Sequence, residues 1–211
     1  IISLLDADRI TEQFLVVYQD IIRFFDGEYP AYRASNTHYH NMEHTIMVTL
    51  AAARLIHGSV QSGYQFNPDN VLVGLLAALF HDSGLIQTKQ DKKGTGAKYT
   101  IGPEKRRVNS MRKNLAKKYF TLPQMDDCAQ LINCTNVKIK LSDIPFRSKD
   151  VENLGKIVGS ADLLAQMGDR HYLEKLILLF KEFEEVAFKL GKGEGSAIVE
   201  TQAGFHIIQL I

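Results

Sequence analysis

The chain has 211 residues, 45% of them hydrophobic, and its 25 basic residues almost balance its 24 acidic residues. These values are typical of one globular domain, which we assign to residues 1–211, and the balanced charge argues against nucleic acid or an anionic membrane as a partner. The early acidic residues are unlike a signal peptide, and no apolar run approaches the roughly 18 residues of a membrane span, so we expect a cytoplasmic protein.

Apolar residues recur at steps of three and four along most of the chain, which predicts helices. Gly27 and Gly58 mark the expected ends of the first two. The third starts with the cap-and-proline pair Asn67–Pro68, and its centre, residues 71–80, is apolar on all sides, which predicts a buried position. The expected helices comprise residues 6–27, 41–58, 67–84, 103–120, 122–137, 151–168, 169–190 and 197–211.

Residues 85–102, between the third and fourth of these helices, are polar and rich in glycine and lysine, which predicts a surface loop. No stretch alternates with the period of two expected of a strand, and no repeat or long linker divides the chain. The expected architecture is therefore a single all-α domain of about eight helices. Cys128 and Cys134 could form a disulfide, although two reduced thiols are the simpler expectation for a cytoplasmic protein.

Three histidines lie within HYHNMEHT, residues 38–45. His40 and His44 are four residues apart, a spacing that places two side chains on one face of a helix. The preceding turn-forming residues put His40 at or before the helix start and His44 in the first turns, with Asn41 as the natural N-cap. The two histidines could share a metal ion, divide metal binding and proton transfer between them, or be ordinary surface residues.

An adjacent pair, His81–Asp82, ends the helix that is otherwise apolar. Burying a charged group is costly unless the group is paired or binds a metal, so this pair requires a partner from elsewhere in the chain. The alternative is an aspartate that only ends the helix, next to a histidine at the negative end of the helix dipole.

Asp162 lies in GSADLLAQ, residues 159–166, among small and apolar residues, and it could simply cap a helix that restarts there. Taken together, however, the three segments offer two imidazoles and two carboxylates. Such a set can fix one divalent ion and leave positions for water, and the two oxygens of the first aspartate could also bridge to a second ion. The candidate ligands are His44, His81, Asp82 and Asp162.

In this order, the four residues resemble the motif of the HD-domain superfamily of metal-dependent phosphohydrolases, which consists of a histidine, a distant His–Asp pair and a further aspartate. The separations here are 37 and 80 residues, and the resemblance spans most of the chain. It implies a multi-helix HD-type fold that binds one or two divalent ions and hydrolyses a phosphoester. The ions could be zinc, manganese, magnesium, iron, nickel or cobalt, because histidine and aspartate discriminate poorly among them.

The closest resemblance within that superfamily is to the catalytic domains of class I cyclic-nucleotide phosphodiesterases. YHNMEHT, residues 39–45, resembles their Tyr-His-Asn-x-x-His signature. The resemblance implies that His40 is the general acid that protonates the leaving oxygen, and that His44 is a metal ligand. Tyr39 could contact the substrate near this site, or it could be a core aromatic residue.

TQAGFHII, residues 201–208, resembles the Gln-x-x-Phe element of the same enzymes. The resemblance implies that Gln202 hydrogen-bonds a purine base and that Phe205 stacks on it. The two residues are three apart, so the expected last helix would present both on one face. The alternatives are core packing for Phe205 and a structural amide for Gln202.

The chain also departs from the phosphodiesterase pattern. It is shorter than the usual catalytic domain, and the second histidine that follows the family's His–Asp pair is replaced within Leu85–Ile86–Gln87. This absence puts support of the transition state and hydration of a second metal in doubt, rather than binding of the first metal. Glu104 is a candidate for the glutamate that lies behind the metal ligands in that family.

The expected function is that of a metal-dependent phosphohydrolase that cleaves a nucleotide-type phosphoester, such as a 3′,5′-cyclic nucleotide. Hydroxide formed from metal-bound water at Asp82 would attack the phosphorus, and His40, with an unperturbed pKa of about 6.5, would protonate the leaving group. Two alternatives stay open, a nucleotide monophosphate phosphatase of the same superfamily and a non-catalytic metal- or nucleotide-binding module. The expected partner is the small-molecule substrate, with no nucleic acid and no membrane, and a homo-oligomer is left open.

Overall fold

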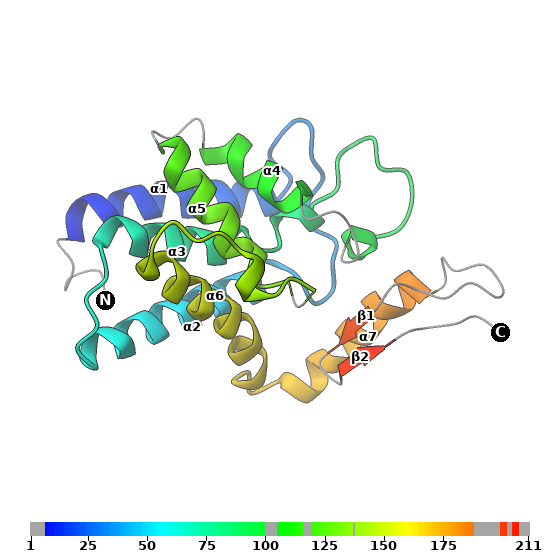
Figure 1. The fold of residues 1–211 in the computed structure, drawn as a ribbon. Coiled ribbons are helices and arrows are strands. Elements are labelled where there is room, and N and C mark those ends of the chain that lie inside the picture. The colour runs from blue at the N-terminus through cyan, green and yellow to red at the C-terminus, as the bar shows by residue number, and fades with distance from the viewer. Residues whose placement is uncertain are drawn as a thin grey trace.

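The computed structural model of the chain describes residues 7–99, 105–115, 120–136, 138–187, 199–201 and 204–206 (Figure 1). The predicted all-α fold class is confirmed. The α-helices are α1 (Ala7–Phe25), α2 (Met42–Gln61), α3 (Pro68–Phe80), α4 (Lys105–Leu115), α5 (Leu122–Asn133), α6 (Lys149–Met167) and α7 (Tyr172–Ala187). The other elements are the 3-10 helices η2 (Ser83–Leu85), η3 (Gly96–Tyr99) and η4 (Leu141–Asp143), and the short strands β1 (Val199–Thr201) and β2 (Gly204–His206).

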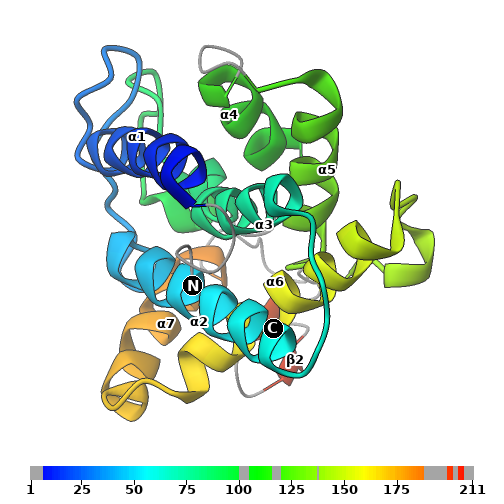
Figure 2. The same cartoon turned by 90° about the vertical axis from the view of Figure 1, so that its left-hand side faces the viewer.

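Helix α3 forms the centre of the domain. Every residue from Val71 to Phe80 is buried, as its apolar sequence predicts. The helix packs against α1, α2, α5 and α6, which lie around it in Figure 2. Because His81 and Asp82 directly follow this helix, the packing holds both residues in the interior of the molecule.

Small residues allow α2, α3 and α6 to approach one another closely. Ala52 of α2, Ala78 of α3 and Ala161 of α6 are fully buried in one cluster, together with Val48 and Ala165. Alanine occupies little volume, so the backbones on either side can come near each other while the packing stays dense. The middle of α2, the end of α3 and the second half of α6 therefore meet.

Two glycines of α6 face the end of α5. A Cβ atom at Gly159 would lie 2.5 Å from the carbonyl oxygen of Cys134, and one at Gly155 would lie 2.8 Å from the Cys134 sulfur. Both distances are too short for a real contact, so any larger residue would push the two helices apart. Cys134 and Cys128 are both free thiols, as the sequence indicates for a reduced protein.

Glycine marks the end of α1 but not that of α2. Gly27 follows α1 with a φ of 75°, in the left-handed region that favours glycine, which confirms the predicted end of this helix. The predicted end of the second helix at Gly58 is wrong, because α2 continues to Gln61. The glycine with a left-handed backbone is instead Gly63, with a φ of 93°.

The predicted last helix, residues 197–211, is wrong where the structure describes it. Strands β1 and β2 pair there in an antiparallel hairpin. The β-branched Val199 and Thr201 favour extended backbone, whereas Gly204 weakens a helix. A short apolar run does not distinguish a strand from a helix by periodicity, which explains the error.

The predicted surface loop between α3 and α4 is partly buried. Gln87 is only 1% exposed, and its side chain accepts a hydrogen bond from Asn36 Nδ2 at 3.1 Å and donates one to the Gly94 carbonyl at 3.0 Å. An isolated β-bridge between Tyr32 and Thr88 adds a backbone connection. The loop is therefore hydrogen-bonded to the segment that leads into α2.

Arg106 of α4 fixes the turn that follows Asp82. Its guanidinium donates to the carbonyl oxygens of Gly84 at 2.6 Å and Ile86 at 2.7 Å, and it lies 3.7 Å from the centre of the Tyr99 ring. We expect Arg106→Ala to lower the free energy of unfolding by about 3 kcal/mol, because two carbonyls of buried residues lose charged donors. Urea denaturation measures this change.

A matched control for this variant is Arg112→Ala, which removes an exposed ion pair with Asp126. Exposed pairs contribute less than about 1 kcal/mol, so this variant should unfold close to the wild-type midpoint. Equal losses of stability in the two variants would contradict the role given to Arg106.

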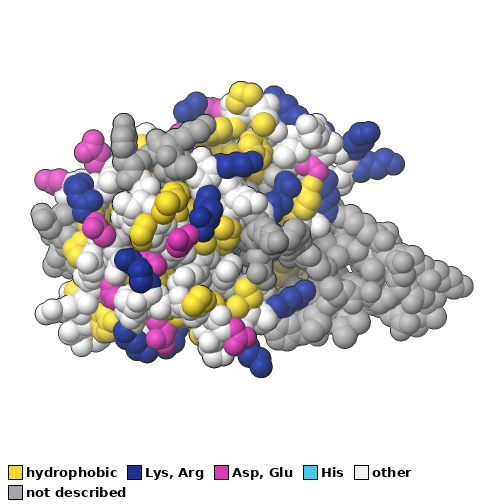
Figure 3. All heavy atoms as spheres, turned by 45° about the horizontal axis from the view of Figure 1, so that its top comes forward, with side chains coloured by type: hydrophobic (Ala, Val, Ile, Leu, Met, Phe, Trp, Pro, Cys, Tyr) yellow, Lys and Arg dark blue, Asp and Glu magenta, His cyan; other side chains and the backbone are white. Residues whose placement is uncertain are grey.

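The molecular face shown in Figure 3 carries basic and acidic side chains that are interspersed. This mixture creates no field of a single sign over that face. Among the helices of the described residues, none combines the length and the apolar character needed to cross a lipid bilayer.

Candidate metal centre

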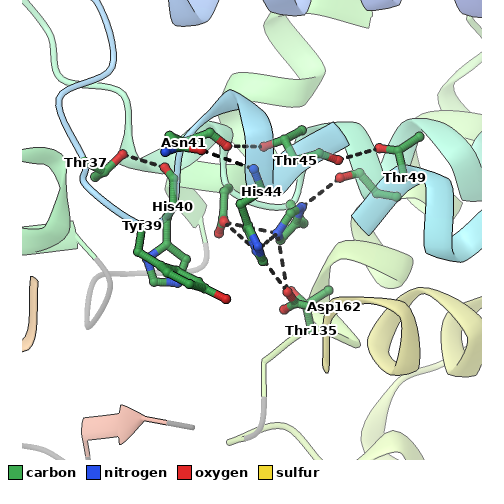
Figure 4. Close-up of polar contacts among 12 residues, drawn as sticks. Thr37, Tyr39, His40, Asn41, His44, Thr45, Thr49, Thr135 and Asp162 are labelled. Carbon is green, nitrogen blue, oxygen red and sulfur yellow. Dashed lines mark hydrogen bonds and ion pairs between the residues drawn. The ribbon is translucent and has the colours of Figure 1, made fainter. Parts of the chain in front are cut away.

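The four predicted ligands converge where α2, α3 and α6 meet, and Figure 4 shows His44 and Asp162 directed toward each other. His44 Nε2 lies 3.3 Å from His81 Nε2 and 3.2 Å from Asp162 Oδ1. Asp82 Oδ2 lies 3.0 Å from His81 Nε2 and 3.6 Å from His44 Nε2. Atoms that bind one ion at about 2.0–2.2 Å lie about 3.0–3.5 Å apart, so these spacings fit a single divalent ion.

The N-cap of α2 directs His44 toward the cluster. Asn41 Oδ1 accepts a hydrogen bond from the His44 backbone N–H at 3.1 Å, which confirms the predicted cap. His44 lies in the first turn and is 7% exposed, whereas its neighbour Glu43 faces solvent. His40 precedes the helix, so the two histidines do not share a helical face as their spacing alone suggested.

A backbone hydrogen bond fixes the orientation of the His81 ring. His81 Nδ1 lies 2.7 Å from the carbonyl oxygen of Ala78. Because a carbonyl can only accept, Nδ1 carries the hydrogen, and the neutral ring presents the lone pair of Nε2 to the cluster. Metal-binding histidines are commonly oriented in this way.

Asp162 lies inside the continuous helix α6, so the alternative of an N-cap is wrong. The cap of α6 is Ser148, whose hydroxyl accepts a hydrogen bond from the Val151 N–H at 3.2 Å. Asp162 Oδ1 and Asp82 Oδ2 are both buried and form no hydrogen bond among the described residues, and imidazole nitrogens lie 3.2 and 3.0 Å from them. Buried carboxylate oxygens are costly in this state unless a positive charge lies between them, which is the strongest structural indication of a cation site.

The charges of the cluster shift the pKa values of its members in opposite directions. Burial opposes ionisation of Asp82, but His81 and His40 outweigh it and hold the pKa of this carboxyl well below its ordinary value. Burial also opposes protonation of His81, but Asp82 and Asp162 outweigh it and raise its pKa. Without a metal, therefore, the carboxylates favour the protonated form of His81, and the histidines favour the ionised form of Asp82.

His40 lies beside the cluster and is held by Glu182 of α7. His40 Nδ1 is 2.6 Å from Glu182 Oε2, and the backbone N–H groups of Tyr39 and His40 donate to Glu182 Oε1 at 2.5 and 3.3 Å. Burial opposes protonation of His40, but Asp82 and Glu182 outweigh it and raise its pKa to about 9. His40 therefore carries a proton at neutral pH, close to the cluster, since its ring centre lies 5.6 Å from that of His44.

Glu182 was not identified from the sequence, although a signal is present. It is 3% exposed and shares the inner face of α7 with Leu178 and Leu179, at helical spacings of three and four residues. A single acidic residue on an apolar helix face requires a buried partner. Glu104, the glutamate selected from the sequence, lies outside the described residues.

Tyr39 is buried and lies next to His40 and His44. Its ring centre lies 5.0 Å from that of His40 and 5.2 Å from that of His44, and Figure 4 shows the three side chains together. Its 6% exposure agrees with core packing, and its position also gives it a share in the pocket beside the cluster.

That pocket opens next to His44 between α2, the end of α6 and the start of α7. Met47 and Leu178 provide apolar surface. Lys175 provides a positive charge, which is paired with Glu43 at 2.8 Å and with Asp169 at 2.5 Å. The pocket therefore offers both apolar and charged surface next to the candidate ligands.

The structure has no helix that carries the predicted base-binding residues Gln202 and Phe205 in its described part. Gln202 lies outside the described residues, and Phe205 belongs to strand β2, with its side chain outside the described part. The expectation that a helix presents the two on one face is therefore wrong, because the segment forms a hairpin.

Comparison with known proteins gives one match. A family model described as Npun_R2479-like matches residues 12–200, which include all four candidate ligands, His40 and Glu182. No curated protein and no solved structure matches the chain.

Proposed function

The chain belongs to the Npun_R2479-like family, and we propose that it is a metal-dependent phosphohydrolase that acts on a nucleotide-type phosphoester. The observation that carries this proposal is the convergence of two imidazole nitrogens and two buried carboxylate oxygens that form no hydrogen bond among the described residues. A protonated histidine beside them supplies the second component that ester cleavage needs.

In this proposal His44, His81 and Asp162 hold the metal, because one atom of each lies within 4.8 Å of the others. Asp82 completes the set through its contacts with both imidazoles. A bound divalent ion would supply charge neutralisation at the phosphoryl oxygens and an acidified water as the nucleophile. The buried positions of His44, His81 and Asp82 keep bulk water away from their charges and strengthen their effect.

His40 is the proposed proton donor to the leaving oxygen. Its raised pKa keeps the ring protonated at neutral pH, and Glu182 fixes the ring through Nδ1. The opposite nitrogen, Nε2, then carries the proton that can be donated. Glu182 acts through His40 and is in this sense a positioning residue.

A nucleotide-type substrate is proposed from the sequence resemblance and from the pocket beside His44. Apolar surface from Met47 and Leu178 suits a base or sugar. Lys175 can contact a phosphate oxygen by exchanging one of its two carboxylate partners for it. A cyclic nucleotide and a nucleotide monophosphate both fit this description, and the products of the two reactions distinguish them.

Hydrolysis assays test the proposal directly. The purified chain, stripped of metal and reloaded with manganese, is expected to cleave a chromogenic phosphodiester or phosphomonoester, and a chelator should abolish the turnover. Release of phosphate from a monophosphate would identify a phosphatase, whereas formation of a monophosphate from a cyclic nucleotide would identify a phosphodiesterase. Retention of metal without turnover of any of these substrates would contradict the proposal.

That contradicting outcome would favour the alternative of a non-catalytic metal- or nucleotide-binding module. The observation behind this alternative is the segment Leu85–Ile86–Gln87, which replaces the second histidine of the phosphodiesterase pattern. The Gln87 amide in this segment forms hydrogen bonds with Asn36 and with the Gly94 carbonyl.

A further inference from the structure

Helix α7 has two apolar faces, and the described residues cover only one of them. Leu178, Leu179 and Glu182 face inward, toward the pocket and His40. On the opposite side of the helix, Leu173 is 77% exposed and Ile177 is 61% exposed. A helix that is apolar on both sides is normally buried on both sides, so the outer face requires a partner.

The outer face forms a continuous stripe. Leu173, Ile177 and Phe180 follow the spacing of four and three residues that aligns side chains along a helix, and Phe180 is 47% exposed. Within the described part of the chain, α7 packs mainly against η3 and β1, and Figure 1 shows it at the edge of the molecule beyond α6. All three side chains of the stripe are therefore exposed among the residues that the structure describes.

We propose that this stripe is a homodimer interface in which α7 pairs with α7 of a second copy, antiparallel and about a twofold axis. The proposal does not depend on the chemistry of the metal centre. The charged residues beside the stripe indicate that the partner is a second copy of the chain. When two copies of the helix lie antiparallel, these residues place opposite charges next to each other.

Two exposed residues of opposite charge, Glu174 and Lys181, carry this argument. They are seven residues apart, which places them on the same flank of the stripe, about 10 Å from each other along the helix. The midpoint between them lies between Ile177 and Leu178. A twofold axis through this point brings Glu174 of each copy opposite Lys181 of the other, so one dimer gains two ion pairs.

The dimer would also stabilise the helix that positions His40 beside the candidate metal centre. The inner face of α7 carries Glu182, which holds His40, and Lys175, which pairs with Glu43 of α2. Covering the outer face with a second copy would hold α7 between two apolar surfaces. The candidate metal centres of both copies would then lie next to the paired α7 helices.

The mass of the full chain in solution, measured by sedimentation equilibrium over a range of concentrations, tests the proposal. A dimer is expected, and Ile177→Glu should raise its dissociation constant by about 100-fold or more, because a charge enters the centre of the interface. Leu15→Glu is the matched control on α1, where Leu15 is 47% exposed. It should leave the dimer unchanged, and circular dichroism should show unchanged helix content in both variants.

A charge exchange identifies the register. Glu174→Lys should raise the dissociation constant about tenfold, because both ion pairs become repulsive contacts, and combining it with Lys181→Glu should restore dimerisation. A monomer at every concentration would overturn the proposal, and so would a dimer that Ile177→Glu does not weaken. Failure of the double exchange to restore the dimer would overturn the antiparallel arrangement.

Discussion

Substitution of His81 by alanine is expected to lower the affinity of the chain for a divalent ion by about 100-fold or more, which is the scale seen when metal sites lose essential support. His81 Nε2 lies within 3.3 Å of His44 Nε2 and 3.0 Å of Asp82 Oδ2, so no other side chain can take its position. The variant should lose metal during dialysis and lose hydrolytic activity with it. Calorimetric titration with manganese or zinc measures the affinity.

The matched control is His57→Ala, because His57 lies on α2 and contacts Gln61 rather than the cluster. This variant should bind metal as tightly as the wild-type chain. Both variants should keep their helix content, since the core around α3 does not depend on either imidazole. Tight metal binding by the His81 variant would mean that these residues do not form the site.

Metal binding should also release a proton from His81. Burial opposes protonation of the ring, but Asp82 and Asp162 outweigh it and raise its pKa in the metal-free protein, so the protonated ring persists to higher pH than a free imidazole does. The ring must lose this proton to bind a metal, and the affinity should therefore rise with pH until the raised pKa is passed. Titrations in buffers with different enthalpies of ionisation measure the number of protons released.

The sequence was sufficient to predict the elements that depend on local pattern. The all-apolar run of α3 predicts its burial, and Asn41 predicts the start of α2, because a cap and a helix interact within one turn. Both features depend on residues close together in the sequence, so one segment is enough to predict each of them.

The features that could not be predicted depend on distant partners. Glu182 is 142 residues away from His40, and nothing within α7 identifies which buried group it meets. The hairpin of β1 and β2 replaces a predicted helix because short apolar segments are compatible with both structures until their neighbours are known. The polar segment around Gln87 is buried for the same reason, since its partner Asn36 belongs to another part of the chain.

Replacing His40 by asparagine is expected to lower kcat by about 10²- to 10⁴-fold, the usual contribution of a general acid, while the metal stays bound. Turnover should fall without loss of metal, because His40 bonds to Glu182 and is not in the group of residues whose atoms are close enough to hold the ion. Steady-state kinetics and metal analysis of the same samples check this. Loss of metal from the His40 variant would contradict its role as proton donor.

Glu182→Gln is the sharper version of this test, because it keeps the shape of the side chain and removes its charge. The Glu182 carboxylate contributes to raising the pKa of His40 to about 9, so its loss should lower that pKa. A general acid fails above its pKa, and the alkaline limb of the pH–activity profile should therefore move to lower pH. Glu152→Gln, which changes a surface pair with Lys149 and Lys156, is the matched control.

Nuclear magnetic resonance titration of the His40 ring measures the same pKa without activity. A folded-state pKa of about 9 against 6.5 for a free imidazole corresponds to about 3 kcal/mol of stability, present below pH 6.5 and lost as the pH rises through 9. Metal should lower this pKa by cancelling the charges of Asp82 and Asp162, and Glu182→Gln should lower it further. If the substitution left the His40 pKa unchanged with and without metal, Glu182 would have no role in holding the proton.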